Sequence, residues 1–215
     1  MTIRAVIWDF GGVLTSSPFE AFNRYEAANA IPLDFIRGVN AVNPDANAWA
    51  QFERSEVSID QFDMLFADES AARGHRIAGR DVIALLGGDV RQVMAEALRR
   101  CSLRYKVGCI TNNVPAGKGP GMMLDDARAQ AVRDVMALFH HIIESKRAGI
   151  RKPDPRIYQM SCEALGVAPN ESIYLDDLGV NLKPARELGM RTIKVGEPDK
   201  ALAELEALLG HSLRD

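Results

Sequence analysis

Cysteine is scarce in this sequence, and the few cysteines are far apart. Among 215 residues there are three, Cys101, Cys109 and Cys162. An odd number at wide spacing argues against a disulfide framework and against a zinc knuckle. We therefore expect all three to be small buried side chains of the hydrophobic core.

Long runs of one charge and long hydrophobic stretches are also missing. The 26 basic residues nearly balance the 29 acidic ones, and no run of five or six like charges suggests a basic arm or an acidic tail. Nucleic acid and membrane surfaces are therefore not expected as partners. The first apolar stretch ends in an acid, lacks a small-residue cleavage site and is too short to span a bilayer. These features predict a cytoplasmic protein. We expect a monomer or a homodimer, and the sequence leaves the choice between them open.

The sequence does contain a regular alternation of strand and helix patterns. Stretches with helical periodicity follow the second, third and fourth of five short apolar runs, at 123–138, 154–165 and 179–188. This alternation is typical of an α/β protein with a parallel sheet. We expect a Rossmann-like, three-layer core whose strands are the five runs, at residues 3–9, 106–111, 140–144, 172–176 and 191–195.

The interval between the first two predicted strands is too long for one crossover connection. It covers about 95 residues and shows several helical patterns without a convincing strand. We expect residues 16–88 to form a helical cap domain inserted after the first strand, and residues 1–15 and 89–215 to form the core. A helix over 90–103 would return the chain to the sheet. Six of the eight phenylalanines should form the small core of this cap, namely Phe19, Phe22, Phe35, Phe52, Phe62 and Phe66.

Acidic residues end two of the predicted strands. Asp9 follows the first run, and Asp176 with Asp177 closes the fourth. An acid at the end of a buried strand is costly unless its charge is used there. The carboxyl ends of parallel strands share one edge of the sheet, so these acids can converge on one pocket. Magnesium suits such a set, because it takes oxygen ligands and usually needs only one or two carboxylates plus phosphate.

Two glycines lie shortly after the first acid, and they allow backbone N–H groups to approach an anion. Asp9 stands in WDFGGVLT, where Gly11 and Gly12 allow a sharp turn and the N–H groups near Phe10 can approach a ligand closely. Asp9 there is either a nucleophile facing a phosphate or the cap of a local turn. The neighbouring segments favour the first alternative.

Polar residues at two further places suit a phosphoryl group. The second strand ends in ITNN, which offers the Thr111 hydroxyl and the amides of Asn112 and Asn113. Lys152 precedes a proline in GIRKPDPRIY, so its ammonium is presented ahead of a helix that Asp154 can cap. A lone lysine is more often a solvated surface residue, but here it can compensate Asp176 and Asp177.

In this order and spacing the segments around Asp9, Thr111, Lys152 and Asp176 resemble those of the haloacid dehalogenase-like hydrolase superfamily. The stretch from HHIIESKRAGIRKPDPRIY to YLDDLGVNLKPARELGM looks like the amino-terminal phosphatase domain of soluble epoxide hydrolases and related bacterial sugar-phosphatase-like hydrolases. The resemblance covers nearly the whole chain and includes the helical cap. It implies a magnesium-dependent phosphatase that acts on a small phosphorylated metabolite.

The resemblance also assigns roles to these residues. Asp9 would be the nucleophile that forms an aspartyl-phosphate, and Lys152 would neutralise charge. The phosphoryl group would be held by Thr111 and Asn112. The substrate would also contact Phe10, Gly11, Gly12 and Asn113. Asp9, Asp177 and the backbone carbonyl of Gly11 would bind magnesium, supported by Asp176 and Asn181.

One position departs from the family pattern. Most phosphatases of this superfamily have a second aspartate two residues after the nucleophile, and this chain has Gly11. Loss of general acid–base help slows a reaction by about 10²- to 10⁴-fold without abolishing it. We therefore expect good leaving groups, such as acyl phosphates or anomeric sugar phosphates. Two alternatives remain: a metal-independent haloacid dehalogenase-type hydrolase, or a catalytically weak phosphate-binding or regulatory module.

Overall fold

The chain folds around a five-stranded parallel sheet. Its structure is a computed structural model that describes residues 2–112 and 126–214. The strand order is β3-β2-β1-β4-β5, with β1 at the centre. The five predicted strands are confirmed with small shifts at their ends, as β1 (Ala5–Trp8), β2 (Lys106–Thr111), β3 (His141–Glu144), β4 (Ser172–Asp176) and β5 (Arg191–Lys194).

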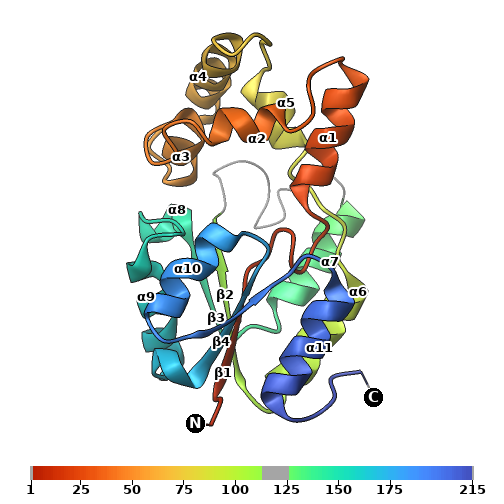
Figure 1. Cartoon of the computed structure of the whole chain (residues 1–215), viewed down its shortest axis with the longest axis vertical. Helices are drawn as coiled ribbons and strands as arrows, with labels where there is room; N and C mark the ends of the chain where they lie inside the picture. Colours follow the sequence, from red (N-terminus) through yellow and green to blue (C-terminus); the bar gives the residue numbers. More distant parts are fainter. Residues whose placement is uncertain (1, 113–125, 215) are drawn as a thin grey trace.

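Helices cover both faces of the sheet, so the predicted three-layer α/β architecture is confirmed (Figure 1). The alternation of side chains along β1 shows how the layers form: Val6 and Trp8 pack into one hydrophobic cluster, and Ala5 and Ile7 into the other. The first face carries α6 (Gln92–Ser102), α7 (Asp126–Met136) and α11 (Pro198–Leu209). The second carries α8 (Ser145–Ala148), α9 (Pro155–Leu165) and α10 (Gly179–Glu187), and a short 3-10 turn (Pro169–Glu171) precedes β4.

Local sequence explains where α9 begins and ends. The Asp154 carboxylate accepts a hydrogen bond from the Arg156 N–H at 3.0 Å, and Pro155 occupies the first turn. The helix ends at Gly166, whose φ of 66° is the left-handed conformation that glycine adopts without strain. The beginning of α9 at Asp154 and Pro155 thus anchors the segment just before it, which carries Lys152.

Five helices lie beyond the carboxyl ends of the strands, at the top of Figure 1. We call α1–α5 the cap helices. They have their own hydrophobic cluster, in which Phe22, Phe52, Phe62 and Phe66 are buried and Phe19 and Phe35 pack against them. Their bounds are α1 (Pro18–Ala28), α2 (Phe35–Asn40), α3 (Ala48–Glu53), α4 (Ile59–Ala71) and α5 (Gly79–Ala84). The division into two domains at residues 16–88 stays a prediction.

Two linkers join the cap helices to the sheet, and they lie side by side. Thr15 and Val90 form an antiparallel bridge. The Ser16 N–H donates to the Asp89 carbonyl at 2.9 Å, and the Arg91 N–H donates to the Leu14 carbonyl at 2.8 Å. Both linkers therefore enter the core beside the turn that follows Asp9, where the Leu14 N–H donates to the Phe10 carbonyl at 2.9 Å.

The cysteines and the lengths of the helices can be compared with the sequence analysis in the part of the chain that the structure describes. All three cysteines are buried and free, as predicted. Within residues 2–112 and 126–214, no helix combines the length and apolar character needed to cross a membrane.

Candidate functional site

Asp9 stands at the carboxyl end of the central strand. Its backbone N–H donates to the Leu175 carbonyl at 2.8 Å, which continues the pairing of β1 with β4. Its carboxylate is buried, and the Oδ1 atom accepts from the Phe10 N–H at 2.7 Å and from Lys152 Nζ at 2.6 Å. Two donors thus fix the orientation of this carboxylate.

Lys152 brings a buried positive charge between two acids. Its side chain is 1% exposed, and Nζ lies 2.6 Å from Asp9 Oδ1 and 2.9 Å from Asp176 Oδ2. Burial acts to lower the pKa of Lys152, but the negative charges of Asp176 and Asp9 outweigh it, so the net pKa is raised. The ammonium therefore stays charged throughout the neutral range.

Asp176 is held by a network of hydrogen bonds on the α9–α10 face of the sheet. The Leu178 N–H donates to Oδ1 at 2.8 Å, and Asn181 Nδ2 donates to both carboxylate oxygens, at 3.0 and 3.1 Å. The Tyr174 hydroxyl donates to Oδ2. The Asn181 carbonyl accepts in turn from the Tyr158 hydroxyl at 2.8 Å. These bonds use the lone pairs of Asp176 and favour a structural, orienting role for it.

Asp177 is less enclosed and lies against the turn that follows Asp9. Burial and the negative charge of Asp176 raise the pKa of Asp177 to about 6, although Lys152 and Arg91 act in the opposite direction. Gly12 has a φ of 80°, and a Cβ there would collide with the Asp177 carboxylate. Glycine is therefore required at this position, both for its backbone conformation and for close approach of this acid.

The charges of the cluster fit a divalent cation. One carboxylate oxygen from each of Asp9, Asp176 and Asp177 lies within 4.8 Å of the other two. Lys152 supplies one positive charge against these three acids. Burial raises the pKa of Asp9 well above its usual range, and the charges of Asp176 and Asp177 add to this, while Lys152 opposes it. A set of oxygen donors with excess negative charge is the chemistry that magnesium prefers.

The Asn112 amide bonds to the backbone of Lys152, and its predicted role towards a phosphoryl group stays a prediction. Asn112 Nδ2 donates to the Lys152 carbonyl at 3.0 Å, and Asn112 Oδ1 accepts from the Lys152 N–H at 2.9 Å. Both ends of the amide therefore hold the backbone of Lys152. The Phe10 N–H likewise donates to Asp9. Thr111 is buried at the end of β2, and Asn113 lies outside the described residues.

Sequence reasoning missed two residues at this site. Tyr174 lies two residues before Asp176 on the same strand, so the period of two places both side chains on one face. That spacing could have indicated the hydrogen bond. Arg91 reaches the site through a linker, where its Nε donates to the Thr15 carbonyl at 3.0 Å. No local pattern indicates that Arg91 lies near Asp177.

Comparison with known proteins bears on these residues. The family model of haloacid dehalogenase-like hydrolases matches residues 3–189. Mouse bifunctional epoxide hydrolase 2 is 31% identical over 222 residues, which are 98% of this chain and 39% of that protein. Phosphatase MT3486 of Mycobacterium tuberculosis (strain CDC 1551 / Oshkosh) is 30% identical over 207 residues, 91% of this chain and 88% of the relative. The chain spans 19 to 40% of the length of four mammalian relatives.

A solved structure agrees with the fold. A haloacid dehalogenase family enzyme from Bacteroides thetaiotaomicron, in complex with magnesium and inorganic phosphate, aligns with a TM-score of 0.59. The sequences are 21% identical, and the alignment covers 91% of this chain and 96% of that one. The family match over most of the sequence, together with this fold, shows that the chain belongs to the haloacid dehalogenase-like hydrolases.

Proposed function

We propose that this hydrolase is a phosphatase that transfers a phosphoryl group from a small phosphomonoester to Asp9 and then to water. The observation that carries the proposal is the buried arrangement of three carboxylates and one ammonium at the carboxyl edge of the sheet. Relatives named as phosphatases, including the mycobacterial protein, support this choice. So does the comparison structure that holds magnesium and phosphate.

The first half-reaction follows from the orientation of Asp9. Both donors that the described chain gives to this carboxylate bind Oδ1, so we assign the attack on phosphorus to Oδ2. The new bond joins Oδ2 to phosphorus, and the bond to the leaving oxygen breaks with its electron pair. Lys152 offsets the charge that develops beside Asp9 and Asp176. The Thr111 hydroxyl is the proposed donor to a phosphoryl oxygen.

The second half-reaction restores the carboxylate. A water oxygen attacks phosphorus, the bond to Asp9 breaks, and orthophosphate leaves with the proton lost from the water. Asp9, Asp177 and the Gly11 carbonyl are the proposed magnesium ligands, with Asp176 and Asn181 as supports. When bound there, magnesium would neutralise and orient the phosphoryl oxygens. Asn112 is proposed to act through Lys152, whose backbone it holds.

Phosphate release by the purified chain tests this proposal. The panel contains phosphorylated metabolites, p-nitrophenyl phosphate and acetyl phosphate, each with magnesium and with a chelator, for the parent chain and Asp9→Asn. Release that requires both magnesium and Asp9 supports the phosphatase. Magnesium binding without release supports the weak phosphate-binding module. Halide release from a 2-haloacid in the presence of chelator supports the dehalogenase.

Gly11 makes a sharper version of this test possible. We propose that the missing acid restricts the enzyme to good leaving groups, and the structure shows room to restore it. A Cβ built at Gly11 meets no atom within 4 Å, and its φ lies outside the left-handed range. Gly11→Asp should raise kcat/KM for alkyl phosphates by about 10²-fold or more and change that for acetyl phosphate little. Equal rates on both substrates in the parent chain contradict the proposal.

The choice of substrate stays open within small phosphorylated metabolites. The cytoplasmic location and the monomeric or homodimeric state also stay predictions.

A further inference from the structure

The cap helices contact the core beside Lys152. Glu53 ends α3 and is buried, with 6% of its side chain exposed. Its carboxylate Oε2 lies 2.8 Å from Arg151 Nε. Its backbone carbonyl accepts a hydrogen bond from the Ser145 hydroxyl at 3.0 Å. Arg151 Nη1 also donates to the Pro44 carbonyl, at 3.2 Å. One arginine of the core thus makes two contacts with the cap side of the molecule.

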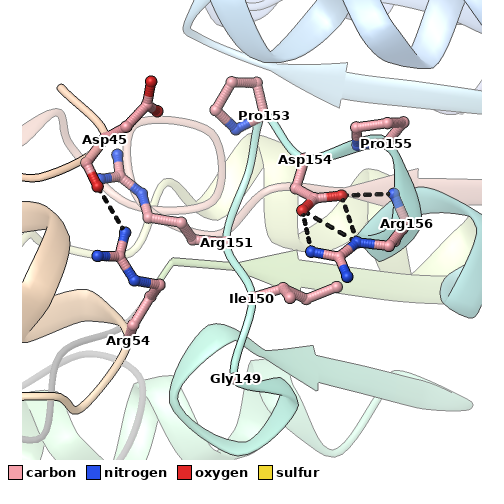
Figure 2. Close-up of a pocket in the computed structure, with 9 residues that line it drawn as sticks. All are labelled: Asp45, Arg54, Gly149, Ile150, Arg151, Pro153, Asp154, Pro155 and Arg156. Atoms are coloured by element: carbon pink, nitrogen blue, oxygen red, sulfur yellow. Dashed lines mark hydrogen bonds and ion pairs between the residues drawn. The ribbon is translucent and has the colours of Figure 1, made fainter.

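Arg151 is the residue directly before Lys152, and the two side chains serve different parts of the molecule. Lys152 extends to Asp9 and Asp176, while Arg151 extends to Glu53. Figure 2 shows Arg151 reaching from its segment towards Asp45. On the core side, Asn112 holds the Lys152 backbone at both its N–H and its carbonyl. The peptide bond between Arg151 and Lys152 therefore connects the Glu53–Arg151 pair with the Lys152 ammonium.

A hollow of about 400 Å³ lies beside this contact, and Arg151 is one of three arginines that line it. Asp45, Arg54, Arg151, Asp154 and Arg156 are among the residues that line it (Figure 2). Arg54 pairs with Glu56, and Arg156 pairs with Asp154, so each has a partner two residues away. The carboxylate partner of Arg151 is Glu53, which belongs to α3 of the cap helices. These pairings leave the hollow without the excess positive charge that an anion site would need.

Burial makes the pair sensitive to the position of the cap. Burial raises the pKa of Glu53, while the charges of Arg151 and Lys152 act to lower it. A carboxylate in this position stays ionised at low cost only while the guanidinium is beside it. Movement of α3 away from the sheet would separate the two groups and let water reach both.

We infer that Glu53 and Arg151 are positioning residues that couple closure of the cap helices to the placement of Lys152. The ammonium lies between Asp9 and Asp176 when the pair is formed, and it loses that alignment when the pair opens. The catalytic part of this inference rests on the proposed phosphatase function. The coupling itself rests on the contacts alone.

Four variants of the full chain test the coupling: Glu53→Gln, Arg151→Gln, the double variant, and Glu56→Gln as a matched control. Glu56 pairs with Arg54 nearby, but its side chain is 50% exposed. Hydrogen exchange followed by mass spectrometry is measured without substrate or metal on peptides from α3 and from residues 149–156. Steady-state kcat and KM are measured on acetyl phosphate with magnesium.

Each single variant is expected to speed exchange at least fivefold in both peptides and to lower kcat at least tenfold with a smaller change in KM. The double variant should match the single variants within twofold, because all three break the same contact. Glu56→Gln should match the parent chain in both assays.

Three results would overturn the coupling: faster exchange in one peptide only, losses that multiply in the double variant, or a kcat equal to that of the parent chain. If Glu53→Gln does not fold, Arg151→Lys replaces it, with a smaller loss expected because the charge is kept. If the parent chain releases no phosphate, the proposed function fails, and the exchange data still decide the coupling.

Discussion

Replacing Lys152 by methionine should destabilise the protein, because it leaves two buried carboxylates without their shared cation. The Lys152 Nζ lies 2.6 Å from Asp9 and 2.9 Å from Asp176, and the lysine is 1% exposed. A carboxylate oxygen of Asp9 lies within 4.8 Å of one of Asp176. Two negative charges at this separation repel each other by about 3 kcal/mol at an effective dielectric constant of about 20. Removal of one partner from a buried ion pair costs about 3 to 5 kcal/mol. We expect the free energy of unfolding of Lys152→Met to be about 3 to 5 kcal/mol lower than that of the parent chain at pH 8.

The loss should shrink as the pH falls. Burial already raises the pKa of Asp9, and the variant lacks the ammonium that opposes this rise. Between the unfolded-state pKa of about 3.9 and the raised folded-state pKa, the folded variant binds more protons than the unfolded chain. Its stability therefore rises as the pH falls through this window. The deficit at pH 5 should be at least about 1.4 kcal/mol smaller than at pH 8, which corresponds to one pKa unit.

Urea unfolding followed by circular dichroism, with chelator present, measures both effects. Lys200→Met is the matched control, because Lys200 pairs with Glu197 at 2.9 Å with both side chains at least 70% exposed. Its unfolding midpoint should equal that of the parent chain. Our account of the site is wrong if Lys152→Met unfolds at the parent midpoint at pH 8, or if its deficit is the same at both pH values.

Three further predictions concern the residues around this cluster. Gly12→Ala should lower the magnesium affinity about tenfold or more in calorimetric titration, because its Cβ displaces the Asp177 carboxylate. Gly11→Ala should bind magnesium as the parent chain does, because a Cβ there has no neighbour within 4 Å. Equal affinities for the two variants would contradict this. Magnesium affinity should fall as the pH drops below about 6, since burial raises the pKa of Asp177 to about 6 and a carboxylate must be ionised to bind the metal. An affinity that is constant from pH 7.5 to 5 excludes Asp177 as a ligand. Asn112→Ala removes both hydrogen bonds to the Lys152 backbone, so thermal unfolding should show a loss of about 1 to 3 kcal/mol; an unchanged melting temperature would show that these bonds add nothing.

The strands could be predicted from the sequence because each is a short run rich in valine and isoleucine. Asp9 and Asp176 were recognisable for a related reason, since each ends a run that is buried throughout. Parallel strands share one carboxyl edge, so the meeting of the two acids follows from the strand pattern. The cap helices were recognisable through the long interval and its phenylalanines.

The contacts that hold the site together could not be predicted in the same way. Asn112 carries an amide that can bind a phosphoryl oxygen or a backbone, and the sequence does not distinguish these uses. The structure uses it for the Lys152 backbone, which is 40 positions away. The pair of Glu53 and Arg151 joins two segments that have no shared periodicity. Such contacts depend on how the cap rests on the sheet, and local patterns carry no information about that.

The charges of the cluster offer a physical reason why Gly11 is compatible with function. A side chain has room at this position, so crowding does not explain the glycine. Asp9, Asp176 and Asp177 already place three carboxylates together, and Lys152 supplies one compensating charge. The proposed nucleophile, the proposed metal ligands and the compensating ammonium are therefore all in place without a fourth acid. Glycine at position 11 removes only the acid that would protonate the leaving oxygen, so the proposed reaction depends on a leaving group that needs no proton.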